Sequence, residues 1–100
     1  MLKPLLTDLL QGITLDPGLY IVPTPIGNTF DITLRGLRTL ALVDFILCED
    51  TRKTALLLNE YGIQKKLFSF HDHNEKAKLS TVMNKLKQGA TVALVSDAGT

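Results

Sequence analysis

Short runs of consecutive apolar residues recur along the chain, and each run stops abruptly at a polar segment. The run Phe45-Ile46-Leu47-Cys48 does not alternate between apolar and polar positions, which is typical of a strand whose two faces are both covered. Turn-forming and charged residues follow each run, as expected where a strand ends. The pattern predicts four strands, at residues 19–22, 45–48, 67–70 and 91–95.

Between these runs, apolar residues recur three or four positions apart, which is the spacing of one face of an α-helix. The spacing predicts a first helix over residues 32–43 and a second over residues 51–60, closed by Gly62. A third predicted helix, which Gly89 ends, has the most regular amphipathic pattern of the chain. Its apolar row consists of Leu79, Val82, Met83 and Leu86.

Short strands that alternate with longer helices predict an α/β fold, namely a parallel sheet with helices on both faces. Right-handed crossovers place the carboxyl ends of all the strands at one edge, where open α/β sheets bind their ligands. Four polar segments would meet at this edge, and we expect an active site there. They are residues 24–31, 49–52, 71–75 and 96–100.

The first polar segment combines two prolines with one glycine. Pro23 and Pro25 each lack an N–H and fix φ, so we expect the first strand to end before them. Gly27 tolerates a positive φ, and Asp31 is placed to cap the helix that follows. A single glycine makes neither the G-x-G-x-x-G fingerprint nor a P-loop. The segment therefore favours close backbone approach to a small ligand, or a plain connector.

Two carboxylates, Glu49 and Asp50, come directly after the second predicted strand. An acid about 20 residues beyond a first loop often bonds a ribose hydroxyl. The plain alternative is that Asp50 caps the second helix and pairs with Arg52. Both interpretations stay open, because one acid can cap the helix while the other faces a ligand.

The third and fourth segments add a histidine pair and a small-residue loop. An unperturbed histidine titrates near neutrality, so His71 is a candidate general base, with a solvated strand-end histidine as the alternative. Asn74 is suited to cap the third helix. Two histidines and one cysteine give no zinc-like ligand spacing, so no metal site is predicted. Ser96–Gly99 permits close approach of a ligand or forms a tight turn.

Composition narrows the class of protein. A hydrophobic fraction of 45% over 100 residues suits one globular domain. The net charge of +1 leaves no overall electrostatic footprint for nucleic acid, although a local patch is compatible with it. Cys48 is the only cysteine, so no internal disulfide is possible. No apolar run approaches the roughly 20 residues that are needed to span a bilayer. We expect a soluble, cytoplasmic protein without membrane attachment.

The chain divides into residues 1–18 and residues 19–100. Leucines at helical spacing predict a short helix or arm in the first part. The second part is the predicted α/β domain. It stops in the loop after the fourth strand, with no further helix to cover that strand, so we expect a truncated domain.

Four stretches, in the order LYIVPTPIGNTFDITLRGL, CEDTRKT, HDHNE and VALVSDAGT, carry a resemblance to a known family. Over residues 19–100 the chain resembles the tetrapyrrole methylase family, and within it the branch that modifies small-subunit (16S) ribosomal RNA. Such enzymes transfer a methyl group from S-adenosylmethionine to the ribose 2′-hydroxyl of a cytidine. The resemblance implies two α/β domains around the methyl donor, of which this chain matches the first part of the N-terminal one. It also implies the 30S particle as substrate and a homodimer.

The resemblance further implies roles for particular residues at the predicted edge. The first loop of the cofactor site is matched by Pro25, Ile26 and Gly27. The loop that faces the methyl donor is matched by Asp97, Ala98, Gly99 and Thr100. Motifs near the RNA side are matched by Glu49, Asp50, Thr51, Arg52, His71 and Asn74. Phe30 departs from the family pattern, which usually has a small residue there.

Transfer to a hydroxyl asks for a base and for contacts to the RNA backbone. The candidate catalytic bases are Glu49, Asp50 and His71, which the sequence does not rank. The candidate RNA contacts are Arg52 and Asn74, with the lysines Lys53, Lys65 and Lys66 as further phosphate partners.

Three alternatives remain at this point. The first is a methyltransferase of the same family that acts on a ring carbon of a tetrapyrrole. The second is a receiver-like signalling or binding domain, in which the acid pair should follow the first strand rather than the second. The third is an inactive fragment that packs against another copy through uncovered apolar surface.

Overall fold

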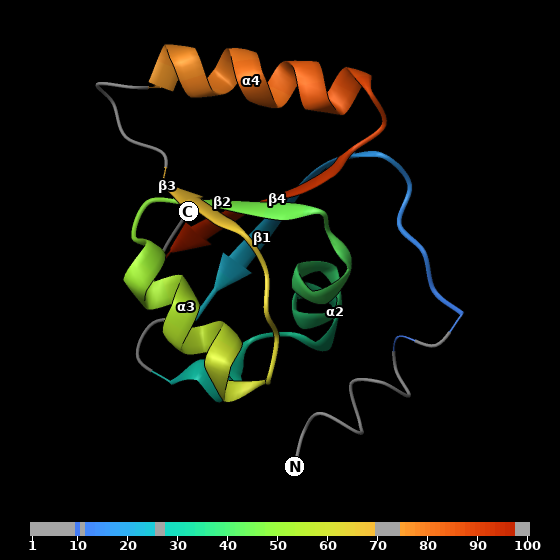
Figure 1. The fold of residues 1–100 in the computed structure, drawn as a ribbon. Coiled ribbons are helices and arrows are strands. Elements are labelled where there is room, and N and C mark those ends of the chain that lie inside the picture. The colour runs from blue at the N-terminus through green and yellow to red at the C-terminus, as the bar shows by residue number, and fades with distance from the viewer. Residues whose placement is uncertain (1–9, 11, 26–27, 70–74, 98–100) are drawn as a thin grey trace.

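The structure is a computed structural model that describes residues 10, 12–25, 28–69 and 75–97. It has an α/β architecture, in which helices cover both faces of a parallel four-stranded sheet (Figure 1). The strands are β1 (Gly18–Thr24), β2 (Phe45–Cys48), β3 (Leu67–Ser69) and β4 (Thr91–Asp97). The helices are α2 (Leu34–Leu42), α3 (Thr51–Glu60) and α4 (Glu75–Lys87), with a short 3-10 turn, η1 (Thr29–Asp31). The predicted fold class is confirmed.

The strand order is β1-β4-β2-β3, so the last strand in sequence lies between the first two. β4 pairs with β1 from Gly18 opposite Thr91 to Thr24 opposite Asp97. Because all the pairs are parallel, the four carboxyl ends lie at the same edge of the sheet. The arrows in Figure 1 point toward this edge.

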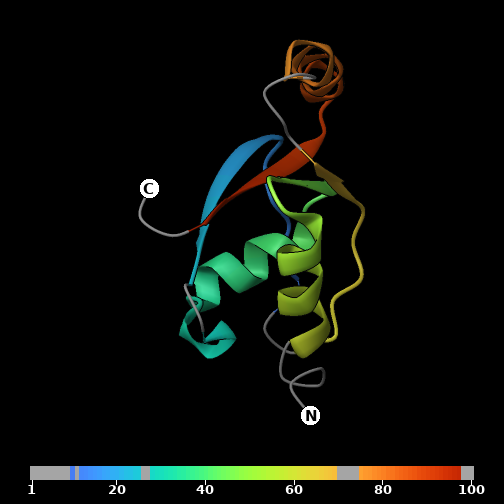
Figure 2. The same ribbon diagram turned by 90° about the vertical axis from the view of Figure 1, so that its left-hand side faces the viewer.

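The helices that follow β2 and β3 in the sequence, α3 and α4, lie on opposite faces of the sheet (Figure 1). Of the described helices, α2 and α3 lie on one face, called here the lower face, and α4 lies on the other, the upper face (Figures 1 and 2). Neighbouring strands whose connections diverge in this way form a topological switch point, where open α/β sheets bind ligands.

The main core lies between the sheet and the two helices of the lower face. All four side chains of β2 are buried, which confirms the prediction that its uninterrupted apolar run is covered on both faces. Leu40 of α2 and Ile46 of β2 have no exposed surface. The other buried members of this core are Val22, Leu37, Val43, Cys48, Leu57, Leu58, Tyr61, Ile63, Ala93 and Val95.

β1 runs through Pro23 to Thr24, two residues beyond the predicted end. Within the described residues, β1 pairs with β4 alone, so it is an edge strand. The N–H of Gly18 donates to the carbonyl of Ala90 in the segment leading to β4, and the direction of backbone groups alternates along a strand. The nitrogen of Pro23 therefore faces the open side, where a missing N–H costs no ladder hydrogen bond.

Thr33, and not Asp31, caps α2. The Thr33 hydroxyl oxygen accepts the N–H of Gly36 at 3.0 Å. Asp31 belongs to the turn η1, which Asn28 caps by accepting the N–H of Phe30 at 2.9 Å. The prediction for Asp31 is wrong because this extra turn moves the helix start two residues along the chain.

The predicted helix ends at Gly62 and Gly89 are confirmed. Both glycines have positive φ, 70° and 91°. After α3, the N–H of Ile63 donates to the carbonyl of Leu58 at 2.9 Å, and after α4 the N–H of Ala90 donates to that of Lys85 at 3.1 Å. These 6→1 bonds are those of the Schellman motif, which needs a left-handed residue that glycine supplies without steric cost.

α4 lies where the amphipathic pattern predicts a helix, but its apolar row is only partly covered. Val82 is buried, whereas Leu79 is 50% exposed and Met83 is 47% exposed. On the same face of the sheet, Leu19 and Ile21 of β1 are also exposed. Figure 2 shows α4 end-on above the β3 side of the sheet and away from β1. One helix is too narrow to cover all four strands, so this face keeps apolar surface open.

We expect replacement of Leu40 by alanine to lower the free energy of unfolding by about 2–5 kcal/mol, because the cavity would lie within the main core. Urea unfolding measures the change. Leu34→Ala on the same helix is the matched control: Leu34 is 65% exposed, and we expect a change below about 1 kcal/mol. Equal effects of the two substitutions would contradict the assignment of the α2 faces.

Candidate active site

The carboxyl ends of β1 and β4 bring the first and fourth polar segments together. Thr24 lies opposite Asp97, and its hydroxyl donates to the carbonyl of Ser96 at 3.4 Å. Pro25 follows directly and is half-buried. The side chains of Thr24 and Ser96 at these two adjacent strand ends are short, polar and half-buried. Residues predicted to hold the methyl donor are therefore neighbours although more than 70 positions separate them in the sequence.

The carboxyl end of β2 carries Glu49 and Asp50. Asp50 is the N-cap of α3: its Oδ1 accepts the N–H of Arg52 at 2.9 Å. The Arg52 Nε also lies 3.5 Å from this oxygen. The predicted cap and ion pair are thus confirmed. Glu49 is exposed beside them, one residue after buried Cys48.

The environment of Asp50 favours its charged form. Hydrogen bonding from the backbone N–H of Arg52 is the main cause that lowers the pKa of Asp50 below its usual 3.8, opposed by partial burial. The backbone N–H of Lys53 and the charge of Arg52 act in the same direction as the main cause. A carboxylate held in this way has a low affinity for a proton. It is well suited to anchor a helix end and less suited to remove a proton.

The end of β3 has a contact that the sequence pattern did not predict. The ammonium group of Lys78, in α4, donates to the carbonyl of Ser69, the last residue of β3. The same nitrogen lies 6.0 Å from the centre of the Phe68 ring. Lys78 falls among charged residues of an amphipathic helix, so nothing in its spacing distinguishes it from a solvated surface lysine.

Two lysines predicted to join Arg52 near RNA phosphates are displaced from it. Lys65 and Lys66 precede β3, and the carbonyl of Lys66 accepts the N–H of Ile46 near the start of β2. They lie at the amino edge, opposite the candidate site. Lys53, in the first turn of α3, is exposed and directly follows Arg52 in the sequence.

Several predicted site residues lie outside the described part of the chain, and their roles stay predictions. These are Ile26, Gly27, His71, Asn74, Ala98, Gly99 and Thr100. The cap predicted at Asn74 is likewise outside it. Asp97 is placed by its backbone, opposite Thr24.

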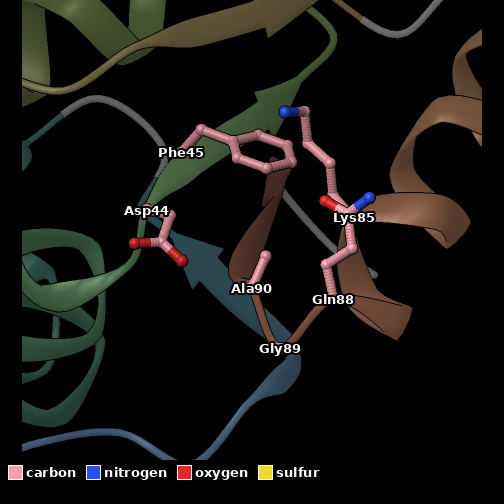
Figure 3. A pocket seen from close by; sticks show the side chains of 6 residues that line it. All are labelled: Asp44, Phe45, Lys85, Gln88, Gly89 and Ala90. Carbon is pink, nitrogen blue, oxygen red and sulfur yellow. The ribbon is translucent and has the colours of Figure 1, made fainter.

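A pocket of about 290 Å³ lies at the opposite, amino edge of the sheet. In Figure 3, Asp44 and Phe45 line one side of it, and Lys85 of α4 and Gln88, directly after α4, line the other. Asp44 also fastens this edge: its Oδ2 accepts the N–H of Thr91 at 2.8 Å, and its own N–H donates to the Thr91 hydroxyl at 3.0 Å. The pocket is separate from the candidate site, and both charged and apolar residues line it.

Within the described ranges, no three His, Cys, Asp or Glu side chains gather closely enough to hold a metal ion. Nor does any helix in this part of the chain combine the length and apolar character needed to cross a membrane.

Residues 18–100 match the family Tetrapyrrole (Corrin/Porphyrin) Methylases. The chain belongs to this family. This confirms the resemblance carried by the four sequence stretches. It also leaves the receiver-like alternative without support, because the acid pair follows β2 and not β1.

Several similar proteins share the name Ribosomal RNA small subunit methyltransferase I. Ribosomal RNA small subunit methyltransferase I of Escherichia coli O157:H7 is 60% identical over 82 residues, which are 82% of this chain and 29% of that protein. The protein of that name from Haemophilus influenzae has the same identity and coverage. That from Mycoplasmopsis pulmonis is 57% identical over 81 residues, 81% of this chain and 36% of the relative. The chain thus spans about a third of the length of these relatives.

The cap at Asp50 leads to a pH-dependent prediction. We expect Asp50→Ala to lower stability near pH 7, because the N–H of Arg52 loses its acceptor, and Asp50→Ser to restore part of it. Because the pKa of Asp50 is lowered in the folded state, its stabilisation is complete above the unfolded value and is lost as the pH falls through the folded one. The advantage of wild type over Asp50→Ser should therefore shrink below about pH 4.

Urea midpoints of the three proteins between pH 2.5 and pH 7 test this prediction. Serine keeps a capping oxygen and lacks a titratable group, so the difference from wild type isolates the Asp50 carboxylate. A difference that stays constant over the whole range would show that Asp50 titrates at its ordinary pKa when the protein is folded.

Proposed function

We propose that the protein containing this chain is an S-adenosylmethionine-dependent methyltransferase that acts on the ribose 2′-hydroxyl of a cytidine in small-subunit (16S) ribosomal RNA. The observation that carries the proposal is 60% identity, over 82 residues, to relatives named Ribosomal RNA small subunit methyltransferase I. Because the chain spans about 29% of those relatives, the activity is proposed for the whole protein and not for these residues alone.

The methyl donor is proposed to bind at the ends of β1 and β4. Pro25 and Asp97, with Ile26, Gly27 and residues 98–100, would form this side of the site. The small polar groups at Thr24 and Ser96 are compatible with a donor rich in hydroxyl and amino groups. S-adenosylmethionine would supply an already activated methyl group. The chain itself has to hold donor and hydroxyl in line.

The ribose is proposed to approach the switch point between β2 and β3. A 2′-hydroxyl is a poor nucleophile until its proton is leaving, so a base within hydrogen-bond reach is useful. Of the two described acids, Asp50 is engaged as a helix cap, whereas Glu49 is exposed at the strand end. We therefore assign the proton acceptor to Glu49. His71 stays a second candidate, and Arg52 and Asn74 are proposed to contact RNA.

The same proposal extends to the substrate particle, the cellular compartment and the oligomeric state. The substrate would be the 30S particle, and the enzyme would work in the cytoplasm as a homodimer. Residues 19–100 would form the first part of an N-terminal α/β domain, with residues 1–18 as an arm. Sedimentation of the full-length gene product tests the dimer.

The family description keeps one competing function open, methylation of a tetrapyrrole ring carbon. The two functions share fold and cofactor and differ in the acceptor. Radiolabelled methyl transfer by the full-length gene product, to 30S particles in one arm and to a uroporphyrinogen-type tetrapyrrole in the other, separates them. Label in the RNA supports the proposal, and label in the tetrapyrrole alone contradicts it.

Calorimetric titration of S-adenosylmethionine tests how far the cofactor site extends. We expect binding by the full-length gene product, and weaker or undetectable binding by residues 1–100, because the cofactor would be shared with a second domain. Failure of the folded full-length product to bind would contradict the methyltransferase proposal.

The two acids can be separated by isosteric amides. We expect Glu49→Gln to lower kcat for RNA methylation by about 10²–10⁴-fold, because the proton acceptor is lost. Asp50→Asn keeps a capping oxygen and should change kcat much less. Equal, large losses in two folded variants would contradict the division of roles between the acids, and unchanged activity in Glu49→Gln would rule out Glu49 as the base.

A further inference from the structure

Among its described side chains α4 buries one apolar residue, Val82, whereas α2 and α3 each bury two leucines. Of its apolar row, Val82 is buried and Leu86 is partly buried against Phe45, Leu47 and Val92. Leu79, one turn closer to the start of the helix, is half exposed. The first turns of α4 therefore have little apolar burial to fix them over the sheet.

Lys78 provides polar contacts at these turns. Its ammonium group donates to the carbonyl of Ser69 and lies 6.0 Å from the centre of the Phe68 ring, within the range of a cation–π interaction. Figure 1 shows that α4 begins at the sheet edge where β3 ends. Lys78 thus ties the beginning of the helix to the last residue of the strand before it.

The Ser69 carbonyl is an acceptor that the sheet leaves free. The carbonyl of Lys66 faces β2, where it accepts the N–H of Ile46. Since backbone direction alternates along a strand, the carbonyl of Ser69, three residues later, faces away from β2. β3 is the edge strand on this side of the described sheet, so Lys78 occupies an acceptor that no strand bonds.

This contact lies beside the candidate site. Ser69 is paired with Cys48, and Glu49 and Asp50 follow Cys48 directly. Neighbouring strands lie about 4.8 Å apart, so the strand end that Lys78 holds is adjacent to the strand end that carries both acids. α3 and α4 lie on opposite faces of the sheet (Figure 1), and Lys78 contacts the end of β3 from the α4 side.

We propose that Lys78 is a positioning residue for RNA. Its contact with Ser69, called here the clasp, holds the first turns of α4 at the end of β3 and so positions the upper side of the acceptor site before the substrate binds. The proposal rests on the proposed function for its substrate. Without the clasp, the RNA would have to order the start of α4 on binding, which weakens affinity. The methyl transfer step, once RNA is bound, would be little affected.

The test uses three variants of the full-length gene product. Lys78→Met keeps side-chain length and helix propensity and removes both the donor and the charge. Lys78→Arg restores a cationic donor. Lys76→Met removes a charge from an exposed position on the same turn, as the matched control.

We expect Lys78→Met to raise KM for 30S particles by about three- to tenfold, the effect of one such hydrogen bond, with kcat and KM for S-adenosylmethionine within about twofold of wild type. Lys78→Arg should return KM to within about twofold of wild type. An equal rise of KM in Lys76→Met would show a general effect of charge and overturn the proposal.

Hydrogen exchange provides a readout that does not depend on activity. We expect faster exchange of amides 79–83 in Lys78→Met, with those of α3 unchanged. If amide exchange in α4 of Lys78→Met is unchanged, Lys78 does not hold the helix. If exchange is faster but KM for 30S particles is unchanged, Lys78 holds the helix without positioning RNA. A wild-type protein without RNA methylation would contradict the proposed function, while exchange would still decide whether Lys78 holds the helix.

Discussion

The parallel pairing of β4 between β1 and β2 is the interaction on which the other features of the structure depend. It joins residues more than 70 positions apart, from Gly18 opposite Thr91 to Thr24 opposite Asp97. It makes β4 a central strand and β1 an edge strand. It also gathers the ends of β1 and β4 at the same edge as the ends of β2 and β3. Without this pairing, the carboxyl ends of these strands would not lie side by side at one edge.

Different interactions hold the helices against the two faces of the sheet. The lower face packs α2 and α3 into a continuous apolar core, in which Leu40 and Ile46 have no exposed surface. In the part of the chain that the structure describes, the upper face carries α4, with a small apolar cluster around Val82 and a hydrogen bond from Lys78 to Ser69. Apolar burial is non-directional, whereas a hydrogen bond specifies a position. The less buried helix therefore depends more on individual polar contacts.

The end of β2 carries two adjacent acids, and it is also where α3 needs an N-cap. The sequence places Glu49 and Asp50 side by side, and α3 needs a cap at this point because its first N–H groups have no helical partners. Asp50 meets that need through the N–H of Arg52, and this contact lowers its pKa. Glu49 is left exposed at the edge. The helix start thus gives two chemically similar acids different environments.

The sequence alone determined the fold class, the positions of the four strands and three helices, the helix ends at Gly62 and Gly89, and the common edge at which the four strands end. These follow from local periodicity, turn chemistry and the handedness of crossovers. The tertiary structure decided the strand order, the continuation of β1 through Pro23, the exposure of the α4 apolar row and the contact of Lys78 with Ser69. Each of these depends on which distant segments become neighbours, and a local pattern shows which face of an element is apolar but not what covers it.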